Sequence, residues 1–123
     1  MSVNFLRTKL QRATVTAARP ASAGSLLLDP TLCCAAGLRP HEPVDVHDLT
    51  NGARFTTRVV FGRSGQVQIN GAAARLVRPG DRVMVAAYAE LSAEEAAGHA
   101  PRVVLLGDRN AIQSIEEHPG SPP

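Results

Sequence analysis

Turn signals recur about every ten residues along this chain of 123 residues and limit the length of every element between them. The clearest are Arg19-Pro20, Asn51-Gly52 and Pro79-Gly80, each of which separates short apolar or alternating runs. Asn-Gly between two such runs is typical of a two-residue β-hairpin, and proline ends a strand because it cannot donate a ladder hydrogen bond. Many short strands with turns at this spacing predict a small all-β barrel or sandwich.

The segments between the turns either alternate apolar and polar residues or form short apolar runs, as strands do. We expect strands at residues 5–17, 26–28, 44–49, 54–61, 66–70, 82–91 and 102–106. Short helices are expected at residues 31–36, after an Asp29 N-cap and Pro30, and at 71–76 and 92–97. We expect residues 1–107 to form one domain and the polar residues 108–123 to form a flexible C-terminal tail.

The composition limits the kinds of partner that we expect this domain to bind and the compartment in which we expect it. The net charge is only +2 and no basic run is present, which argues against nucleic-acid binding. No apolar run is long enough to span a membrane, and the N-terminus lacks the features of a signal peptide, so we expect a cytoplasmic protein. The adjacent Cys33 and Cys34 are poorly placed for a mutual disulfide, and the histidines share no metal-ligand spacing, so no metal site is expected.

Gly24-Ser25, within the small-residue segment 21–25, has the residues that self-cleavage needs. Glycine tolerates a strained, exposed backbone conformation, and the Ser25 hydroxyl stands next to its carbonyl. The hydroxyl can attack that carbonyl and shift the acyl group from nitrogen to oxygen. Elimination of the resulting ester then splits the chain and leaves a ketone at the new N-terminus. Gly-Ser pairs are also ordinary turn residues, so the dipeptide alone does not decide between the two interpretations.

A set of short motifs follows in a fixed order through about residues 6 to 107. No motif is specific alone, but the ordered set is, and it resembles the aspartate 1-decarboxylase family. The resemblance implies a small six-stranded double-psi β-barrel with short helices, a homotetramer, and autocatalytic cleavage of a precursor between Gly24 and Ser25. The motifs are Arg7-Thr8-Lys9-Leu10, Ala13-Thr14-Val15-Thr16, Gly24-Ser25, Ala35-Ala36-Gly37, Thr50-Asn51-Gly52-Ala53-Arg54-Phe55, Thr57, Ile69-Asn70-Gly71-Ala72-Ala73-Ala74 and Pro79-Gly80-Asp81.

The resemblance also implies an activity: a carboxy-lyase that makes β-alanine and carbon dioxide from L-aspartate or a related acidic amino acid, for pantothenate biosynthesis. Ser25 would become a covalent pyruvoyl group, which takes the substrate amine as a Schiff base and draws in the electrons left when carbon dioxide departs. Gly24 would end the smaller fragment, and Thr57 would assist ester elimination. The implied binding residues hold the substrate carboxylate or line the pyruvoyl pocket: Lys9 and Arg54 for the carboxylate, and Asn70, Gly71, Ala72 and Ala73 for the pocket.

Four positions depart from the pattern of the family, and all lie in or close to the implied site. Arg58 stands where the family has a proton-donating tyrosine, Gln11 where it has a histidine, Ser22 in place of a tyrosine, and His47 in place of an aromatic residue near the pocket. We expect Arg58 to bind an anion in the catalytic site, because guanidinium is a poor proton donor. Two interpretations stay open: a decarboxylase with a rebuilt pocket, or a catalytically impaired, uncleaved paralogue with an assembly or regulatory role. The need for a maturation factor and the identity of the proton donor also stay open.

Overall fold

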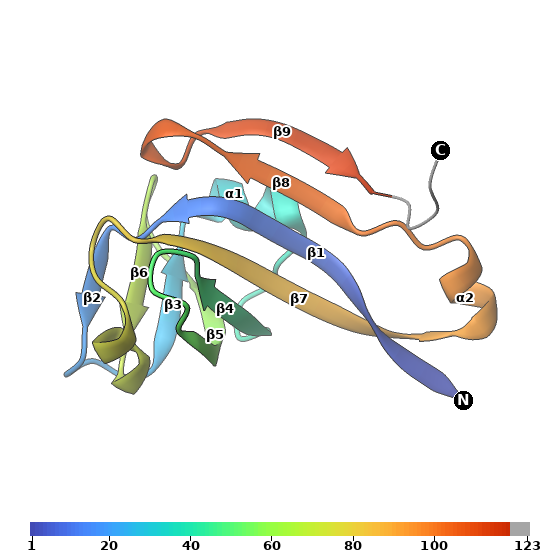
Figure 1. The fold of residues 1–123 in the computed structure, drawn as a ribbon, viewed down its shortest axis with the longest axis horizontal. Coiled ribbons are helices and arrows are strands. Elements are labelled where there is room, and N and C mark those ends of the chain that lie inside the picture. Colours follow the sequence, from blue (N-terminus) through green and yellow to red (C-terminus); the bar gives the residue numbers. More distant parts are fainter. Residues whose placement is uncertain (119–123) are drawn as a thin grey trace.

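The computed structural model describes residues 1–118, in which nine strands alternate with four short helices (Figure 1). The strands are β1 (Ser2–Thr14), β2 (Ala17–Arg19), β3 (Ser25–Leu28), β4 (Pro43–Asp48), β5 (Arg54–Phe61), β6 (Val67–Asn70), β7 (Arg82–Ser92), β8 (Arg102–Leu106) and β9 (Ile112–Glu117). The helices are α1 (Pro30–Ala36) and α2 (Ala93–Ala97), with the 3₁₀ turns η1 (Ala72–Leu76) and η2 (Asp108–Asn110). The predicted all-β class is confirmed, and the described residues form nine strands where the sequence pattern predicted seven.

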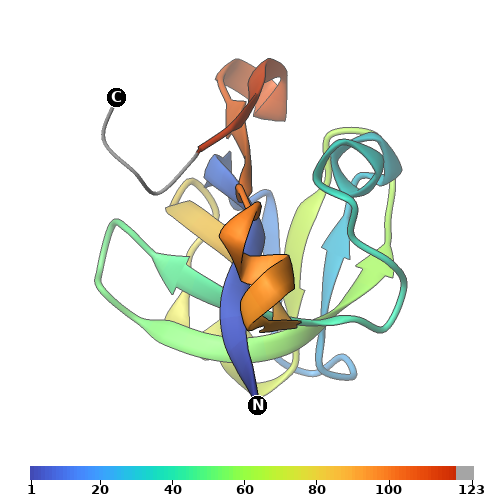
Figure 2. The same ribbon diagram turned by 90° about the vertical axis from the view of Figure 1, so that its right-hand side faces the viewer.

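The strands pair in the order β2-β6-β3-β5-β4-β7-β1-β8-β9 and curve around a common core (Figure 2). Three pairs of neighbouring strands are parallel: β2 with β6, β3 with β5, and β1 with β8. A simple up-and-down meander makes only antiparallel neighbours, because each hairpin reverses the chain. The parallel pair of β3 and β5 matters most for the site, since it sets the start of β3 beside the middle of β5.

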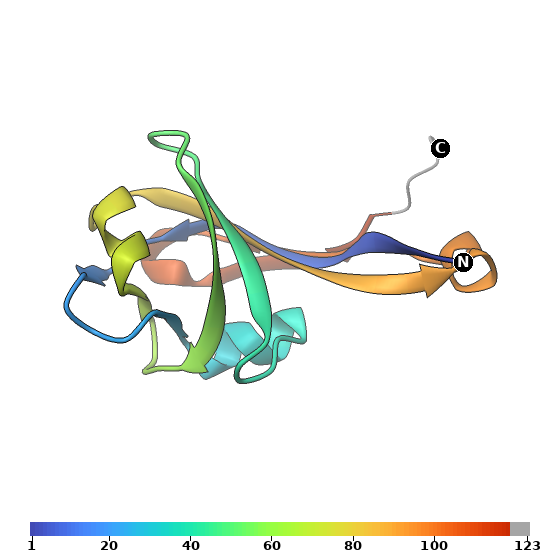
Figure 3. The same ribbon diagram turned by 90° about the horizontal axis from the view of Figure 1, so that it is seen from below.

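The two longest strands form a ribbon that reaches beyond the rest of the barrel. β1 and β7 pair antiparallel from Ser2 with Ser92 to Thr14 with Arg82, interrupted by two register shifts. Figures 1 and 3 show this ribbon extending to the end of the molecule where α2 and the N-terminus lie. The predicted strand over residues 5–17 is therefore divided: β1 ends at Thr14, and β2 begins a separate pairing at Ala17.

Aliphatic side chains fill the interior, and helix α1 closes part of it. The Asp29 carboxylate accepts the Thr31 N–H and Gly37 ends the helix in the left-handed conformation, as the sequence predicts. Of the two cysteines, Cys33 is buried and Cys34 is exposed. Burial, with a smaller effect from Asp29, raises the pKa of the Cys33 thiol to about 12. The largest fully buried side chains include Leu10, Leu26, Leu28, Leu32, Ile69 and Leu106.

The C-terminal segment differs from its prediction as a flexible tail. Residues Ile112–Glu117 form β9, which pairs antiparallel with β8 from Arg102 with Glu117 to Leu106 with Ile112. The buried Asn110 amide anchors this segment, because its Nδ2 donates to the Thr14 and Gly65 carbonyls and its Oδ1 accepts the Thr14 N–H. Residues 119–123 of the predicted tail lie outside the described residues, and the domain boundary at 107 stays a prediction. None of the helices within residues 1–118 is long and apolar enough to cross a membrane.

Candidate active site

Ser25 is the first residue of β3, and its side chain is only 6% exposed. Its hydroxyl donates to the Ala23 carbonyl oxygen at 3.3 Å and accepts from Asn70 Nδ2 at 3.4 Å. Asn70 is the direct cross-strand partner of Ser25 in the antiparallel pair of β3 and β6, so both side chains lie on one face of the sheet. The peptide bond before Ser25 thus carries a buried, oriented nucleophile.

Gly71 lets the chain after β6 approach the Gly24 backbone closely. A Cβ at residue 71 would lie 2.6 Å from Gly24 Cα and 2.9 Å from Gly24 N, which no side chain tolerates. The φ of Gly71, +86°, also lies in the left-handed region that favours glycine. The small residues Ala72 and Ala73 follow at the start of η1. Of the predicted pocket residues, Asn70 and Gly71 therefore lie against the Gly24-Ser25 peptide, and Ala72 and Ala73 follow them in sequence.

Arg58 reaches the same peptide from β5. Its Nε donates to the Gly24 carbonyl oxygen at 3.3 Å, and its Nη1 lies 3.4 Å from His41 Nδ1. The parallel register of Leu26 with Val59 explains the contact, since continuing it by one residue sets Ser25 beside Arg58. A guanidinium on this carbonyl withdraws electron density from the carbon that a nucleophile would attack.

Thr57 precedes Arg58 on β5, and the two side chains point to opposite faces because residues alternate along a strand. Among the described residues, the hydrogen bonds of the Ser25 hydroxyl go to Ala23 and Asn70 and not to Thr57. Thr57 is adjacent in sequence to Arg58, whose side chain contacts the scissile peptide. Its part in elimination stays a prediction.

A second group of predicted residues lies farther along the sheet. His47 on β4 is the cross-strand partner of Arg54 on β5, and both line a cavity of about 180 Å³ together with Asp45. Lys9 on β1 follows on the same face, because the registers run from Lys9 to Ala86 and from Ala86 to Asp45. This group combines three basic side chains that suit an anionic ligand.

The two groups are separated within one chain. Arg54 stands four residues before Arg58, a distance of about 13 Å along an extended strand. Ser25 and Arg58 lie at the middle of β5, and Arg54 and His47 lie at its start. A single chain therefore holds the cleavage group and the carboxylate-binding group apart.

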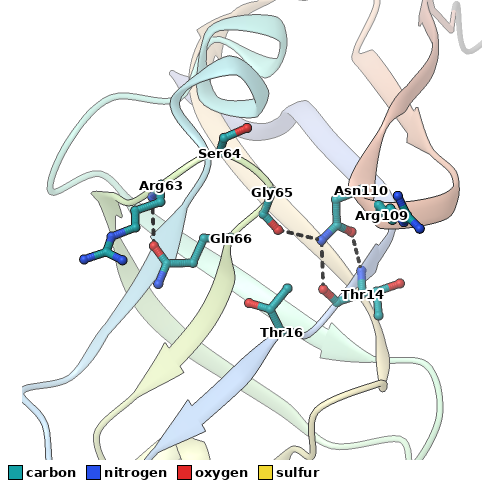
Figure 4. Close-up of a pocket in the computed structure, with 8 residues that line it drawn as sticks. All are labelled: Thr14, Thr16, Arg63, Ser64, Gly65, Gln66, Arg109 and Asn110. Atoms are coloured by element: carbon teal, nitrogen blue, oxygen red, sulfur yellow. Dashed lines mark hydrogen bonds between the residues drawn. The ribbon is translucent and has the colours of Figure 1, made fainter.

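A further cavity, of about 570 Å³, opens between β1, the loop after β5 and η2 (Figure 4). Its wall includes Gln66, whose Oε1 accepts the Arg63 N–H at 2.8 Å, and Asn110 with its bonds to Thr14 and Gly65. The predicted site residues do not line this cavity. Within residues 1–118, no cluster of three or more His, Cys, Asp or Glu side chains is suited to a metal ion.

Comparisons with known proteins show which family this chain is in. The family model for aspartate decarboxylase matches residues 1–113. The chain belongs to the aspartate decarboxylase family. Among similar proteins, the aspartate 1-decarboxylase of Phenylobacterium zucineum is 50% identical over 115 residues, 92% of this chain and 98% of that protein. Those of Clostridium beijerinckii and Caulobacter vibrioides are 44% and 47% identical over 120 and 115 residues, covering 96% and 92% of this chain and 97% and 98% of theirs.

In this member of the aspartate decarboxylase family, three side chains at the site were absent from the sequence prediction. His41 contacts Arg58, and Gln66 and Gln68 continue the line of amides that ends at Asn70. The spacing of residues 66, 68 and 70 on a predicted strand is a usable signal, since alternate residues share a face. His41 gives no such signal, because it lies in the loop before β4 and reaches Arg58 only through the fold.

Proposed function

We propose that this protein is a self-processing, pyruvoyl-dependent decarboxylase that converts L-aspartate to β-alanine and carbon dioxide. One observation carries the proposal: the Ser25 hydroxyl is buried beside the Gly24-Ser25 peptide while Arg58 donates to the Gly24 carbonyl. Membership of the aspartate decarboxylase family supports the carboxy-lyase class. The names of the relatives support L-aspartate as substrate.

Self-cleavage begins with attack of Ser25 Oγ on the Gly24 carbonyl carbon. The Oγ–C bond forms, the peptide C–N bond breaks, and the hydroxyl proton passes to the freed amine. Arg58 stabilises the negative charge that builds on the carbonyl oxygen during this transfer, because its Nε already donates to that oxygen. Loss of the Ser25 Cα proton and cleavage of the Cβ–Oγ bond then release the Gly24 carboxylate and leave dehydroalanine. Water hydrolyses the imine tautomer of dehydroalanine to the ketone, and the nitrogen leaves as ammonia.

The residues around Ser25 fit the small ketone that this sequence produces. Gly71 brings its backbone so close to Gly24 that no Cβ fits between them, and Asn70 presents an NH2 group to residue 25. Once formed, the ketone supplies an electron-withdrawing carbonyl that accepts the electrons released when carbon dioxide leaves. Asn70, Gly71, Ala72 and Ala73 would hold this group.

The substrate carboxylate would bind Arg54 and Lys9, with His47 beside them. These side chains share one face of the sheet but lie about 13 Å or more from the cleavage group along β5. A homotetramer would resolve this separation by setting the Arg54 group of one copy against the Ser25 group of another. The predicted partner of the chain is therefore a second copy of itself.

The test is the intact mass of the purified protein under denaturing conditions. Wild type is expected to give two fragments, residues 1–24 and 25–123, the larger with a pyruvoyl N-terminus. Ser25→Ala is expected to remain one uncut chain, whereas the control Ser22→Ala, in the same turn, is cleaved. Cleavage of Ser25→Ala would indicate proteolysis. A wild type that stays whole after prolonged warming would favour the uncleaved paralogue or a missing maturation factor.

A further inference from the structure

Three amide side chains on one face of the sheet form a chain of hydrogen bonds that ends at Ser25. Gln66 Nε2 donates to Gln68 Oε1 at 3.0 Å, and Gln68 Nε2 donates to Asn70 Oδ1 at 2.9 Å. Asn70 Nδ2 then donates to Ser25 Oγ at 3.4 Å. We call residues 66, 68 and 70 the amide relay.

The direction of the amide relay is fixed at its outer end. The Arg63 N–H can only donate, so the oxygen of Gln66 must face it, and this bond measures 2.8 Å (Figure 4). The Gln66 NH2 group must then face Gln68, which turns the Gln68 oxygen toward Gln66 and its NH2 group toward Asn70. Asn70 is left with its NH2 group facing Ser25. A backbone donor outside the site thus determines which end of the Asn70 amide meets the nucleophile.

We propose that Gln66 and Gln68 are positioning residues for self-cleavage, which orient the Asn70 amide so that its NH2 group, and not its oxygen, faces Ser25 Oγ. The inference rests on the proposed function. With the NH2 group in place, one lone pair of Oγ accepts from Asn70 and the hydroxyl proton points to Ala23. The second lone pair of Oγ stays available for the Gly24 carbonyl carbon.

Burial and packing support a built arrangement. Gln68 and Asn70 are each 8% exposed, and buried amides without partners are costly, so the relay must be complete to be tolerated. Gly62 leaves room for its outer end, because a Cβ there would lie 2.3 Å from Gln66 Oε1. The charged groups facing this end are Arg19 from β2 and Arg63 from the loop after β5, which line one cavity with Gln66 and Gln68.

The test reverses the relay with an isosteric change. In Gln68→Glu at neutral pH, the carboxylate accepts from Gln66 but cannot donate to Asn70, so the Asn70 NH2 group turns to residue 68 and its oxygen faces Ser25. Cleavage measured by intact mass is expected to be roughly three- to tenfold slower than wild type. The ratio to wild type should rise toward one as the pH falls and the carboxyl becomes protonated, because it can then donate to Asn70. The matched control Gln113→Glu, on exposed strand β9, should equal wild type at every pH.

A second measurement separates positioning from general destabilisation. In an Asn70→Ala background, Gln68→Glu is expected to slow the residual cleavage no more than Gln113→Glu does, because its effect passes through Asn70. An equal slowing in both backgrounds, or a Gln68→Glu defect that does not change with pH, overturns the relay. If wild type is cleaved and Gln68→Glu is cleaved equally fast, the relay is overturned but the proposed function is not. A wild type that is never cleaved overturns the relay and the proposed function together.

Discussion

Arg58 is the residue at which this protein departs most from the pattern of its family, and its contacts suggest what the change does. The sequence suggested an anion-binding group, whereas the guanidinium lies on the Gly24 carbonyl with His41 beside it. Guanidinium keeps its proton at any physiological pH, so it stabilises charge but transfers no proton. We therefore assign Arg58 to the acyl shift, and the proton that replaces carbon dioxide needs another donor.

The first prediction at this scale concerns the rate of self-cleavage. Arg58→Met keeps the length of the side chain but removes the donor to the Gly24 carbonyl, so cleavage should slow by about tenfold, the typical value of one hydrogen bond. Arg82→Met, an equal change at the exposed start of β7, should cleave at the wild-type rate. The measurement is the time course of fragment formation by intact mass. Equal rates for the two variants would mean that Arg58 takes no part in the acyl shift.

The site residues were predictable from sequence to different degrees. Gly24 and Ser25 carry their chemistry in their own side chains and order, and family resemblance adds Asn70, Gly71 and Arg58, which the fold brings to the same peptide. What could not be predicted is the separation of Arg54 from Ser25. The sequence gives the spacing of Arg54 and Arg58 along β5. The pairing of β5 with β3 decides which of the two lies beside the nucleophile.

At the scale of elements, short-range signals predicted most of the structure. The Asp29 cap and the return strand Arg54–Phe61 occur as expected, because each depends on residues adjacent in sequence. Asn51-Gly52 does lie in a hairpin between β4 and β5, but its loop has five residues, 49–53, and not two. Strand β9 was missed because its sequence, Ile112–Glu117, is mostly polar and exposed. Its structure comes from pairing with β8 and from the Asn110 bonds to Thr14 and Gly65, which are long-range contacts.

The junction of β6 and η1 gives a prediction with an internal control. Gly71→Ala should impair both folding and cleavage, because the new Cβ meets the Gly24 backbone and the φ of +86° is strained for alanine. Gly52→Ala has nearly the same φ, +82°, but its Cβ would meet nothing within 4 Å. Thermal unfolding and cleavage should therefore be affected more in Gly71→Ala than in Gly52→Ala. Equal effects in both variants would mean that backbone strain alone matters and that the contact with Gly24 does not.

Two carboxyls between the end of β4 and the start of β7 make stability depend on pH. Burial, then a hydrogen bond that protonated Asp48 donates to Asp81, raises the pKa of Asp48, while accepting that hydrogen bond lowers the pKa of Asp81. Asp48 Oδ1 accepts the Thr50 and Asn51 N–H groups. The stability that Asp48 contributes is therefore complete below the pKa that Asp48 has in the unfolded chain. This stability is lost as the pH rises through the raised pKa that Asp48 has in the folded protein. That of Asp81 is present above its unfolded pKa and is lost as the pH falls through its lowered one.

Asp48→Asn is therefore expected to raise stability at pH 7, by a few degrees in Tm. The asparagine oxygen can still accept from Thr50 and Asn51, and its NH2 group donates to Asp81 without the cost of a buried charge. The advantage over wild type should shrink as the pH falls and Asp48 itself becomes protonated. Asp45→Asn, on the same strand and bonded only through Thr56, serves as the control. If the difference in Tm between Asp48→Asn and wild type is the same at pH 4.5 and pH 7, Asp48 and Asp81 do not share a proton.

At the scale of the whole molecule, the two separated groups make a strong case for assembly. One chain presents Ser25 and Arg58 at the middle of β5 and Arg54 with His47 at its start, about 13 Å away. All of them lie on one face of the sheet, where Arg54 and Arg58 are exposed to a neighbour while Ser25 itself is buried. In a homotetramer, each decarboxylation site would combine the cleavage group of one copy with the carboxylate-binding group of the next.

Mixed oligomers test this arrangement. Ser25→Ala alone should be uncut and inactive, and Arg54→Ala alone should be cleaved but lose about ten- to a hundredfold in kcat/KM for aspartate, because a charge-assisted hydrogen bond is removed. When the two variants are co-expressed with different tags and purified through both, a site can take Ser25 from one chain and Arg54 from the other. Activity per cleaved chain should then rise well above that of Arg54→Ala, toward wild type. Mixed oligomers no more active than Arg54→Ala would mean that each site is completed within one chain, with Arg54 and Ser25 brought together by a movement of β5.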